Sequence, residues 1–223
     1  MDGKLIAQAL TKFAGGLILT GLLLFPAAGT LAWPQGWLLI GVLFVPMFIA
    51  GIVMMVKCPD LLRKRLNMRE EQREQKRVIL LSGLMFIAAF TLAGLSYRFG
   101  WLRLPMWVSC AAAVLFLAGY ALFAEVLREN AYLSRTVEVQ KGQKVIDTGL
   151  YGVVRHPMYM STLLLFLAMP LILGAFLSFL VTLLYFPIIA GRIANEERVL
   201  EAGLEGYADY ERRVKYRLIP HIW

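Results

Sequence analysis

Two short polar clusters stand at the ends of an uncharged stretch, residues 158–191, in the second half of this sequence. The first is the run RHPMY at residues 155–159, and the second contains Arg192 and Glu196. These two residues are four apart, so on a helix they share one face, and Glu197 points away from it. An arginine can hold a carboxylate by a charge-assisted bidentate contact, and a nearby glutamate can orient the arginine or accept a proton. The two clusters together are therefore typical of a binding or catalytic site.

Each cluster also has a purely structural interpretation. Arg155 and Arg192 would then be anchors at the level of the lipid headgroups. Arg192 and Glu196 would form an ordinary surface ion pair worth about 0.3–0.5 kcal/mol, and Tyr207 and Tyr210 would be interface residues on a short amphipathic helix. A site is favoured because the stretch between the clusters is long enough for a helical hairpin, which brings both clusters to the same level.

The composition indicates what kind of element positions these clusters. The chain of 223 residues is 59% hydrophobic and 17% charged, with a mean hydropathy of +0.66. Soluble domains are about 45–50% apolar and about 25% charged. A soluble globular protein, a disordered chain and a disulfide scaffold are therefore disfavoured. The fold class that remains is all-α, a polytopic integral membrane protein.

The apolar stretches predict about six transmembrane helices. A membrane helix needs about 20 apolar residues, and four stretches meet this length at residues 13–32, 37–56, 78–97 and 105–127. One straight helix over 158–191 would be about 51 Å long, which is too long for one crossing. Because Pro170 and Gly174 lie near its middle, we expect a hairpin of helices 158–173 and 176–191. The chain is thus divided into N-terminal helices, residues 1–127, and a C-terminal region, residues 128–223.

The basic residues predict the orientation. If the N-terminus is cytoplasmic, 21 of the 23 Lys and Arg fall in the inner segments 1–12, 57–77, 128–157 and 192–223, as the positive-inside rule requires. The net charge of +8 then reports topology and predicts no nucleic-acid partner. Both termini are expected on the cytoplasmic side of a bacterial or archaeal membrane. Residues 1–32 could instead be a cleaved signal peptide. Aromatic residues are expected at the outer ends of the spans: Trp33, Trp37, Trp101 and Trp107.

The two longer inner loops are expected to differ. In the loop 57–77, Glu70 and Glu74 are at helical spacing from Arg73 and Arg77, which favours a surface helix. In residues 128–157, glycines and β-branched residues predict extended chain or turns packed at the cytosolic face; the branched residues are Val137, Val139, Val145 and Ile146. With two His and no C-x-x-C run, no metal site is predicted.

The C-terminal region also resembles a known family. The run GLYGVVRHPMYMS, the apolar hairpin, the NEERVL segment and the closing GYADYERRVKYRLIP are similar, in order and spacing, to the isoprenylcysteine carboxyl methyltransferase family and its prokaryotic relatives. The resemblance covers about residues 128–223. It implies a membrane fold that binds S-adenosylmethionine without a Rossmann domain, which agrees with the absence of a G-x-G-x-x-G run.

The resemblance also implies roles for individual residues. The acceptor-side pair of the family falls on Arg192 and Glu196, as catalytic residues. The first cofactor position is often His in the family and is Gln143 here, which makes side-chain contacts at 143 and 144 less certain than those of the RHPMY run. The cofactor contacts that the resemblance implies are Gln143, Lys144, Val145, Ile146, Tyr151, His156, Pro157, Met158 and Tyr159.

These residue types suit methyl transfer to a lipophilic membrane acceptor. Such a transfer is an in-line displacement, for which positioning and desolvation supply much of the catalysis. A carboxylate acceptor is already ionised at neutral pH, so Arg192 would hold it and no base is needed. An amine acceptor would need a base, for which Glu196 is the candidate. The sequence therefore predicts an S-adenosylmethionine-dependent methyltransferase, most simply one that O-methylates the carboxyl group of an isoprenylcysteine-like or other lipid substrate.

Two other functions stay open. Membrane sterol-type reductases, which bind NADPH, have a related C-terminal half with an Arg-His-x-x-Tyr run, although the proline after His156 and the two glutamates at 196–197 look more like the methyltransferases. A small transporter or membrane scaffold is the other alternative. It is disfavoured because the first four spans contain no ionisable residue near their centres. The oligomeric state and the acceptor are left undetermined.

Overall fold

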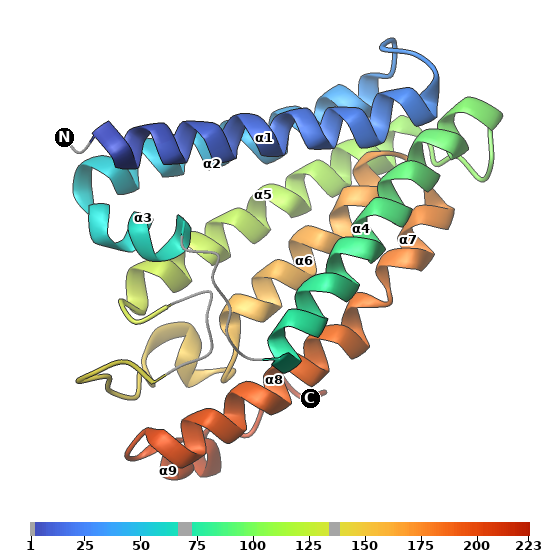
Figure 1. Ribbon diagram of the computed structural model, residues 1–223. Coiled ribbons are helices and arrows are strands. Elements are labelled where there is room, and N and C mark those ends of the chain that lie inside the picture. Colours follow the sequence, from blue (N-terminus) through green and yellow to red (C-terminus); the bar gives the residue numbers. More distant parts are fainter. Residues whose placement is uncertain (1–2, 67–72, 134–138) are drawn as a thin grey trace.

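The protein was analysed as a computed structural model that describes residues 3–66, 73–133 and 139–223 (Figure 1). Within these ranges the regular structure is helical, apart from one isolated β-bridge between Arg103 and Ala175. The all-α prediction is therefore confirmed. The helices are α1 (Gly3–Ala28), α2 (Pro34–Lys57), α3 (Pro59–Leu66), α4 (Arg73–Phe99), α5 (Met106–Glu129), the 3₁₀ helix η1 (Gly149–Gly152), α6 (Pro157–Ile172), α7 (Phe176–Thr182), α8 (Tyr185–Gly203) and α9 (Tyr207–Arg213).

Five helical segments among the described residues are long and apolar enough to cross a membrane: α1, α2, residues 76–99 of α4, α5, and α7 with α8 as one segment. The sixth predicted span, α6, has 16 residues and is therefore about 24 Å long, shorter than the roughly 30 Å of bilayer hydrocarbon. Much of α6 is buried, and its most extensive contact is with α5. A helix enclosed by its neighbours need not itself span the hydrocarbon.

The predicted break in the hairpin lies at Gly174 and not at Pro170, which lies inside the last turn of α6. Gly174 adopts the left-handed conformation, with φ +68°. The Ala175 N–H donates to the Pro170 carbonyl at 2.9 Å and the Gly174 N–H to the Leu171 carbonyl at 3.0 Å. This Schellman arrangement satisfies carbonyls that the helix end would leave unpaired, so the glycine, rather than the proline, ends the helix.

The second arm of the hairpin differs from one continuous helix over 176–191. It is interrupted at Leu183 and Leu184, between α7 and α8. Pro187 explains the position of this interruption, because it has no N–H to donate to the carbonyl of Leu183, and its ring crowds that carbonyl. Helix α8 then continues 12 residues beyond the predicted end, to Gly203, so it carries Arg192 and Glu196 on regular helix.

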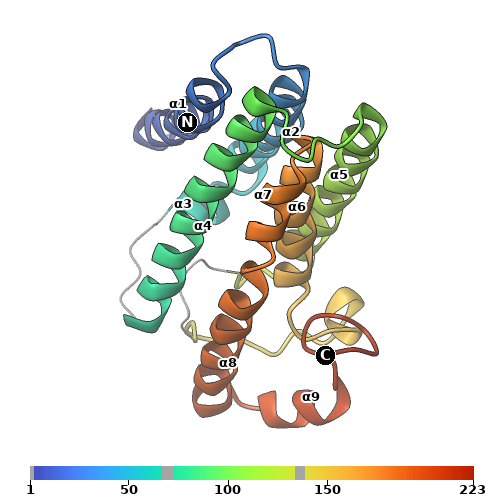
Figure 2. The same ribbon diagram turned by 90° about the vertical axis from the view of Figure 1, so that its right-hand side faces the viewer.

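The helices form an elongated bundle with two unlike ends (Figures 1 and 2). The turn end contains the connections after α1, α4 and α6, which touch one another: the Tyr97 hydroxyl donates to the Ala32 carbonyl at 2.9 Å, and the Leu104 N–H to the Gly174 carbonyl at 2.8 Å. The opposite end, called here the pocket end, holds η1, the start of α6, the end of α8, α9 and the C-terminus. The two polar clusters therefore meet at one end of the bundle, as the hairpin predicts.

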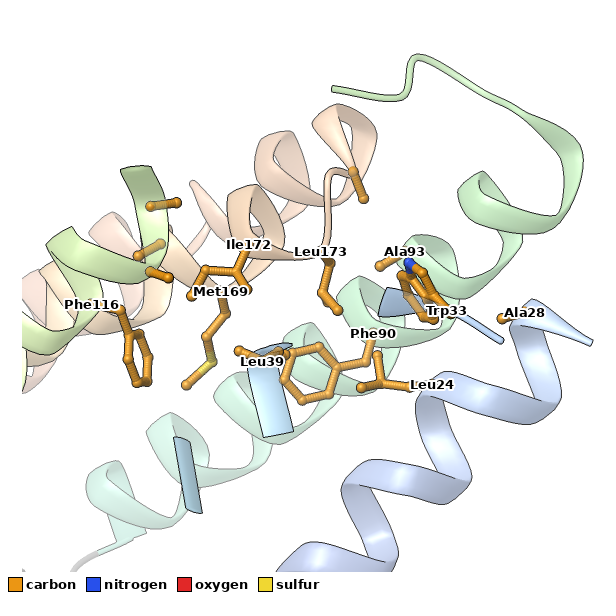
Figure 3. Close-up of a cluster of buried hydrophobic side chains, with 14 of the residues drawn as sticks. Leu24, Ala28, Trp33, Leu39, Phe90, Ala93, Phe116, Met169, Ile172 and Leu173 are labelled. Atoms are coloured by element: carbon orange, nitrogen blue, oxygen red, sulfur yellow. The ribbon is translucent and has the colours of Figure 1, made fainter. Parts of the chain in front are cut away.

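The main apolar core lies near the turn end and joins α1, α2, α4, α5 and α6 (Figure 3). Trp33 belongs to this core and is fully buried, and its ring stacks on Tyr97 with centroids 5.0 Å apart. Trp33 thus lies at the end of a span, as expected, but the expectation that it is an interfacial aromatic is wrong, because its side chain belongs to the core. The other three tryptophans of that group, Trp37, Trp101 and Trp107, are exposed.

The inner loop 57–77 contains α3, and α4 begins at Arg73, so the expectation of a surface helix is met in its described part. The expected pairs of Glu70 and Glu74 with Arg73 and Arg77, and the placement of Val137, lie outside what the structure describes. Val139 and Val145 pack against the cluster of Leu204, Tyr207, Tyr210 and Val214 at the pocket end. This agrees with the predicted packing of residues 128–157.

Helices α1 and α4 pack closely enough that Gly94 has no room for a side chain. A Cβ on Gly94 would lie 2.6 Å from the Ala27 Cβ and 2.7 Å from the Leu24 carbonyl oxygen. Small residues at a membrane helix interface allow such close approach of the backbones. Because the obstructing atoms include rigid backbone, even one added methyl group must push the helices apart.

We therefore expect Gly94→Ala to lower the apparent melting temperature of the purified protein in detergent. The matched control is Gly83→Ala in the same helix, where a Cβ meets nothing within 4 Å. Alanine is favoured over glycine in a helix by about 0.5–1 kcal/mol, so the control should be neutral or slightly stabilising. Equal melting temperatures for the two variants would contradict this packing.

Candidate active site

A cavity of about 830 Å³, including the space at its mouth, opens at the pocket end between the loop before α6, the end of α8 and α9. All eleven residues for which the sequence predicted a role line it. The structure thus brings together two clusters that are more than thirty residues apart in sequence. Their individual roles remain predictions. The eleven are Gln143, Lys144, Val145, Ile146, Tyr151, His156, Pro157, Met158, Tyr159, Arg192 and Glu196.

The RHPMY run is fixed by the backbone on both sides. Pro157 occupies the first position of α6, where the missing N–H needs no helical partner. The N–H groups of Arg155 and His156 donate to the carbonyls of Tyr216 and Arg217, each at 2.9 Å. The C-terminal segment, residues 214–223, is therefore paired with the start of α6 and holds this wall of the pocket in place.

Tyr159 joins the two polar clusters. The Arg192 Nε donates to the Tyr159 hydroxyl oxygen at 2.8 Å, and the Tyr159 hydroxyl donates to the carboxylate of Glu196. The tyrosine is also stacked on the His156 ring, with centroids 5.7 Å apart. Since Arg192 and Glu196 lie one turn apart on α8, the tyrosine from α6 fixes both side chains at the pocket wall.

Glu197 is the most buried acidic residue among those that the structure describes, with 3% of its surface exposed. Its carboxylate lies 2.8 Å from the Arg155 guanidinium, 3.2 Å from the His156 Nε2 and 2.8 Å from the Arg217 Nε. Three basic groups from two segments thus surround one carboxylate of α8. A buried carboxylate needs such compensation, because its transfer from water is otherwise costly.

Arg155 also lines the cavity, but its hydrogen-bonding capacity is used within the protein. Its Nε donates to Glu197, its Nη1 faces the carbonyls of Val214 and Lys215 at 2.9 and 3.3 Å, and its Nη2 faces Glu197 and Glu211 at 2.8 and 3.0 Å. These five contacts match the five N–H groups of a guanidinium. Arg155 is therefore a structural tie between α6, α8 and the C-terminal segment.

The loop before α6 is held by side chains of α5 and α9. The Asn130 amide donates to the Tyr151 hydroxyl oxygen at 2.9 Å, the Tyr210 hydroxyl to the Tyr151 carbonyl at 2.7 Å, and the Leu150 N–H to Glu129 at 3.1 Å. Burial is the main cause that raises the pKa of Tyr151 to about 12, while the Asn130 bond acts against it. The Tyr151 hydroxyl is therefore neutral at physiological pH.

The structure adds residues at the site that the sequence did not identify. Glu197 does not line the cavity but supports its wall; it was placed only as facing away from Arg192, and no signal in the sequence showed the partners it would meet. Tyr207 and Tyr210 were interpreted as interface residues, but they are 4% and 2% exposed and line the cavity. The three-residue spacing on a short helix was the signal that could have placed both on one face. Arg155 was placed in the RHPMY cluster but given no role of its own. Also missed were Asn130, Tyr132, Leu133, Leu200 and Leu204.

The burial of Glu197 gives a prediction for stability. In Glu197→Gln the charged partner of Arg155 and His156 is lost while the shape is kept, and removing one member of a buried ion pair typically costs about 3–5 kcal/mol. We expect a clear drop in the apparent melting temperature in lipid nanodiscs. The control Asp209→Asn removes the exposed pair with Arg212, which is worth at most about 1 kcal/mol. A drop no larger than that of the control would contradict the proposed importance of the buried network.

Comparison with known proteins agrees with this picture. A family model described as phospholipid methyltransferase matches residues 107–205. A stretch of 91 residues is 30% identical to the Delta(14)-sterol reductase TM7SF2 of Mus musculus, and it covers 40% of this chain but 22% of the reductase. The chain therefore spans about a fifth of that relative's length.

The fold is similar to a solved structure, that of the eukaryotic intramembrane Ras methyltransferase ICMT (isoprenylcysteine carboxyl methyltransferase). The TM-score is 0.59 at 20% sequence identity, and the match covers 96% of this chain and 77% of that one. The resemblance predicted from the sequence is therefore confirmed: residues 107–205 match the phospholipid methyltransferase family, within a chain that has the fold of the isoprenylcysteine carboxyl methyltransferase.

Proposed function

We propose that the protein is an S-adenosylmethionine-dependent methyltransferase that acts on a lipophilic membrane acceptor, most simply by O-methylation of the carboxyl group of an isoprenylcysteine-like or other lipid. The observation that carries the proposal is the convergence of the eleven predicted residues on one pocket at the end of an apolar hairpin. We further propose that the pocket end faces the cytoplasm of a bacterial or archaeal cell, as the basic residues indicate.

The lining of the pocket suits the cofactor in polarity, because charged, hydroxyl and backbone groups stand beside apolar side chains, as is usual for small-molecule sites. The residues that would hold the cofactor are the polar and backbone groups at 143–146, Tyr151 and the run 156–159. When bound, S-adenosylmethionine supplies an electrophilic methyl group on a sulfonium.

The orientation of the His156 ring is fixed by a contact with Glu197. Its Nε2 faces the buried carboxylate of Glu197 at 3.2 Å. A carboxylate can only accept, so the Nε2 carries a proton and donates to it. Glu197 would therefore orient the imidazole and leave Nδ1 as the ring nitrogen for a ligand.

Arg192 and Glu196 are proposed to serve the acceptor. Tyr159 holds the guanidinium at the pocket wall through the Nε at 2.8 Å, and a guanidinium held in this way is preorganised for a carboxylate. A carboxylate acceptor is already ionised, so the chain need only place it and exclude water. The Glu196 carboxylate accepts a hydrogen bond from Tyr159, and it is the candidate base if the acceptor is an amine.

We expect Arg192→Ala to abolish methyl transfer while S-adenosylhomocysteine still binds, because the residue is assigned to the acceptor. The measurement uses radiolabelled S-adenosylmethionine with total membrane lipid for transfer, and calorimetry for binding. Arg198→Ala is the matched control, since Arg198 is exposed on the same helix and does not line the pocket; it should retain activity. If Arg192→Ala lost cofactor binding and transfer equally, the assignment to the acceptor would be wrong. Base-labile labelled product would identify a methyl ester.

The second candidate is an NADPH-dependent sterol-type reductase, which is favoured by the 30% identity over 91 residues to a Delta(14)-sterol reductase. The two candidates differ in the ligand of the same pocket. We expect S-adenosylmethionine to raise the apparent melting temperature of the protein in nanodiscs and to give a calorimetric binding isotherm, since a ligand stabilises the state that it binds. We expect NADPH to do neither. Binding of NADPH without binding of S-adenosylmethionine would favour the reductase and overturn the methyltransferase.

A further inference from the structure

The five tyrosines that line the pocket differ in how their hydroxyl groups are used. The hydroxyl groups of Tyr132, Tyr151, Tyr159 and Tyr210 all have hydrogen-bond partners within the protein. The Tyr207 hydroxyl is shielded from solvent and has no hydrogen-bond partner among residues 3–66, 73–133 and 139–223. It is thus the exception in an otherwise satisfied polar wall.

The position of Tyr207 does not require a hydroxyl for packing. Its ring belongs to the apolar cluster of Leu204, Tyr210 and Val214, which a phenylalanine would fill equally well. A buried polar group without a partner costs about 1–3 kcal/mol, and such groups in folded proteins call for a specific explanation. Because the same side chain lines the cavity, the explanation with the most support is a partner supplied by a ligand.

The surroundings of Tyr207 restrict the chemistry of that partner. Burial, followed by the charge of Glu197, raises the pKa of Tyr207 well above its ordinary value, so the hydroxyl remains a neutral donor. The carboxylates of Glu197 and Glu196 both act on it. The nearby cation, Arg155, has all its N–H groups engaged within the protein. A ligand carboxylate placed beside the Tyr207 hydroxyl would therefore meet repulsion from two carboxylates, whereas a neutral acceptor would not.

We propose that the Tyr207 hydroxyl donates a hydrogen bond to the nucleoside half of the cofactor, to a ribose oxygen or a purine nitrogen, rather than to its amino-acid carboxylate. The inference rests on the proposed function. It assigns to α9 a part in recognising the nucleoside, in addition to the cofactor contacts proposed for residues 143–146, Tyr151 and the run 156–159.

The test compares two probes and two variants of the full-length protein in lipid nanodiscs. S-adenosylhomocysteine carries the amino-acid half, and 5′-methylthioadenosine lacks it. Tyr207→Phe should weaken both probes by the same factor, about three- to tenfold, as expected for one hydrogen bond. It should leave the melting temperature of the ligand-free protein unchanged or higher, because it removes an unsatisfied group.

Tyr210→Phe is the matched control. Its hydroxyl donates to the Tyr151 carbonyl at 2.7 Å, so its removal should lower the melting temperature of the ligand-free protein. We therefore expect Tyr207→Phe to lose ligand affinity and Tyr210→Phe to lose stability. If both tyrosines had a purely structural role, the two variants would not differ in this way.

The other outcomes each count against the inference. Unchanged affinity for both probes in Tyr207→Phe, with normal binding by the wild type, would overturn this inference and leave the proposed function intact. Weakening of S-adenosylhomocysteine alone would place Tyr207 at the amino-acid half, against the assignment. A lower melting temperature in the ligand-free variant would show that the hydroxyl has a structural partner. Failure of the wild type to bind either probe would overturn both the inference and the proposed function.

Discussion

The burial of one carboxylate, that of Glu197, is the constraint on which the pocket depends. Arg155 and His156 come from the start of α6, Arg217 comes from the C-terminal segment, and all three face this one residue of α8. Because the carboxylate is shielded from water, each of these groups must stay in place to compensate its charge. The requirement ties three separate segments together at one point, and the walls of the cavity are the surfaces of those segments.

The membrane-type composition explains why the polar groups lie where they do. In hydrocarbon, backbone groups must be satisfied within the helix or by neighbouring chain, and the two breaks of the hairpin meet this condition in different ways. At Gly174 the N–H groups of the turn donate to carbonyls at the end of α6, and the Gly174 carbonyl accepts from the Leu104 N–H. At Leu183 the helix is interrupted because Pro187 has no N–H to donate to the Leu183 carbonyl. Charged side chains are excluded from 158–191 and are concentrated at its ends. The hairpin thereby brings together two polar clusters that are far apart in the sequence.

Much of this arrangement could be predicted from the sequence, and two of the main exceptions share one cause. Hydropathy indicated the helices, and the spacing of Arg192 and Glu196 indicated a shared face. Local patterns could not identify Trp33 as a core residue, since its burial depends on Tyr97, more than sixty residues away. They could not give Glu197 its role either, because its partners lie about forty residues before it and about twenty after it. Errors arose where a contact distant in sequence, rather than local propensity, decides the environment.

The adjacent glutamates 196 and 197 show how one helix can separate two tasks. Consecutive residues of an α-helix point about 100° apart, so Glu196 meets Tyr159 at the cavity while Glu197 meets Arg155 beneath its wall. The Glu197 network holds the wall of the cavity, and through His156 it would leave one ring nitrogen for a ligand that fits between α6 and α9. The Arg192–Tyr159–Glu196 chain is the part for which we propose a role toward the acceptor. A stretch of this chain is similar to a sterol reductase, while its fold is similar to that of a methyltransferase. A fold of this kind does not by itself identify the reaction, so function must be argued from the side chains that line the cavity.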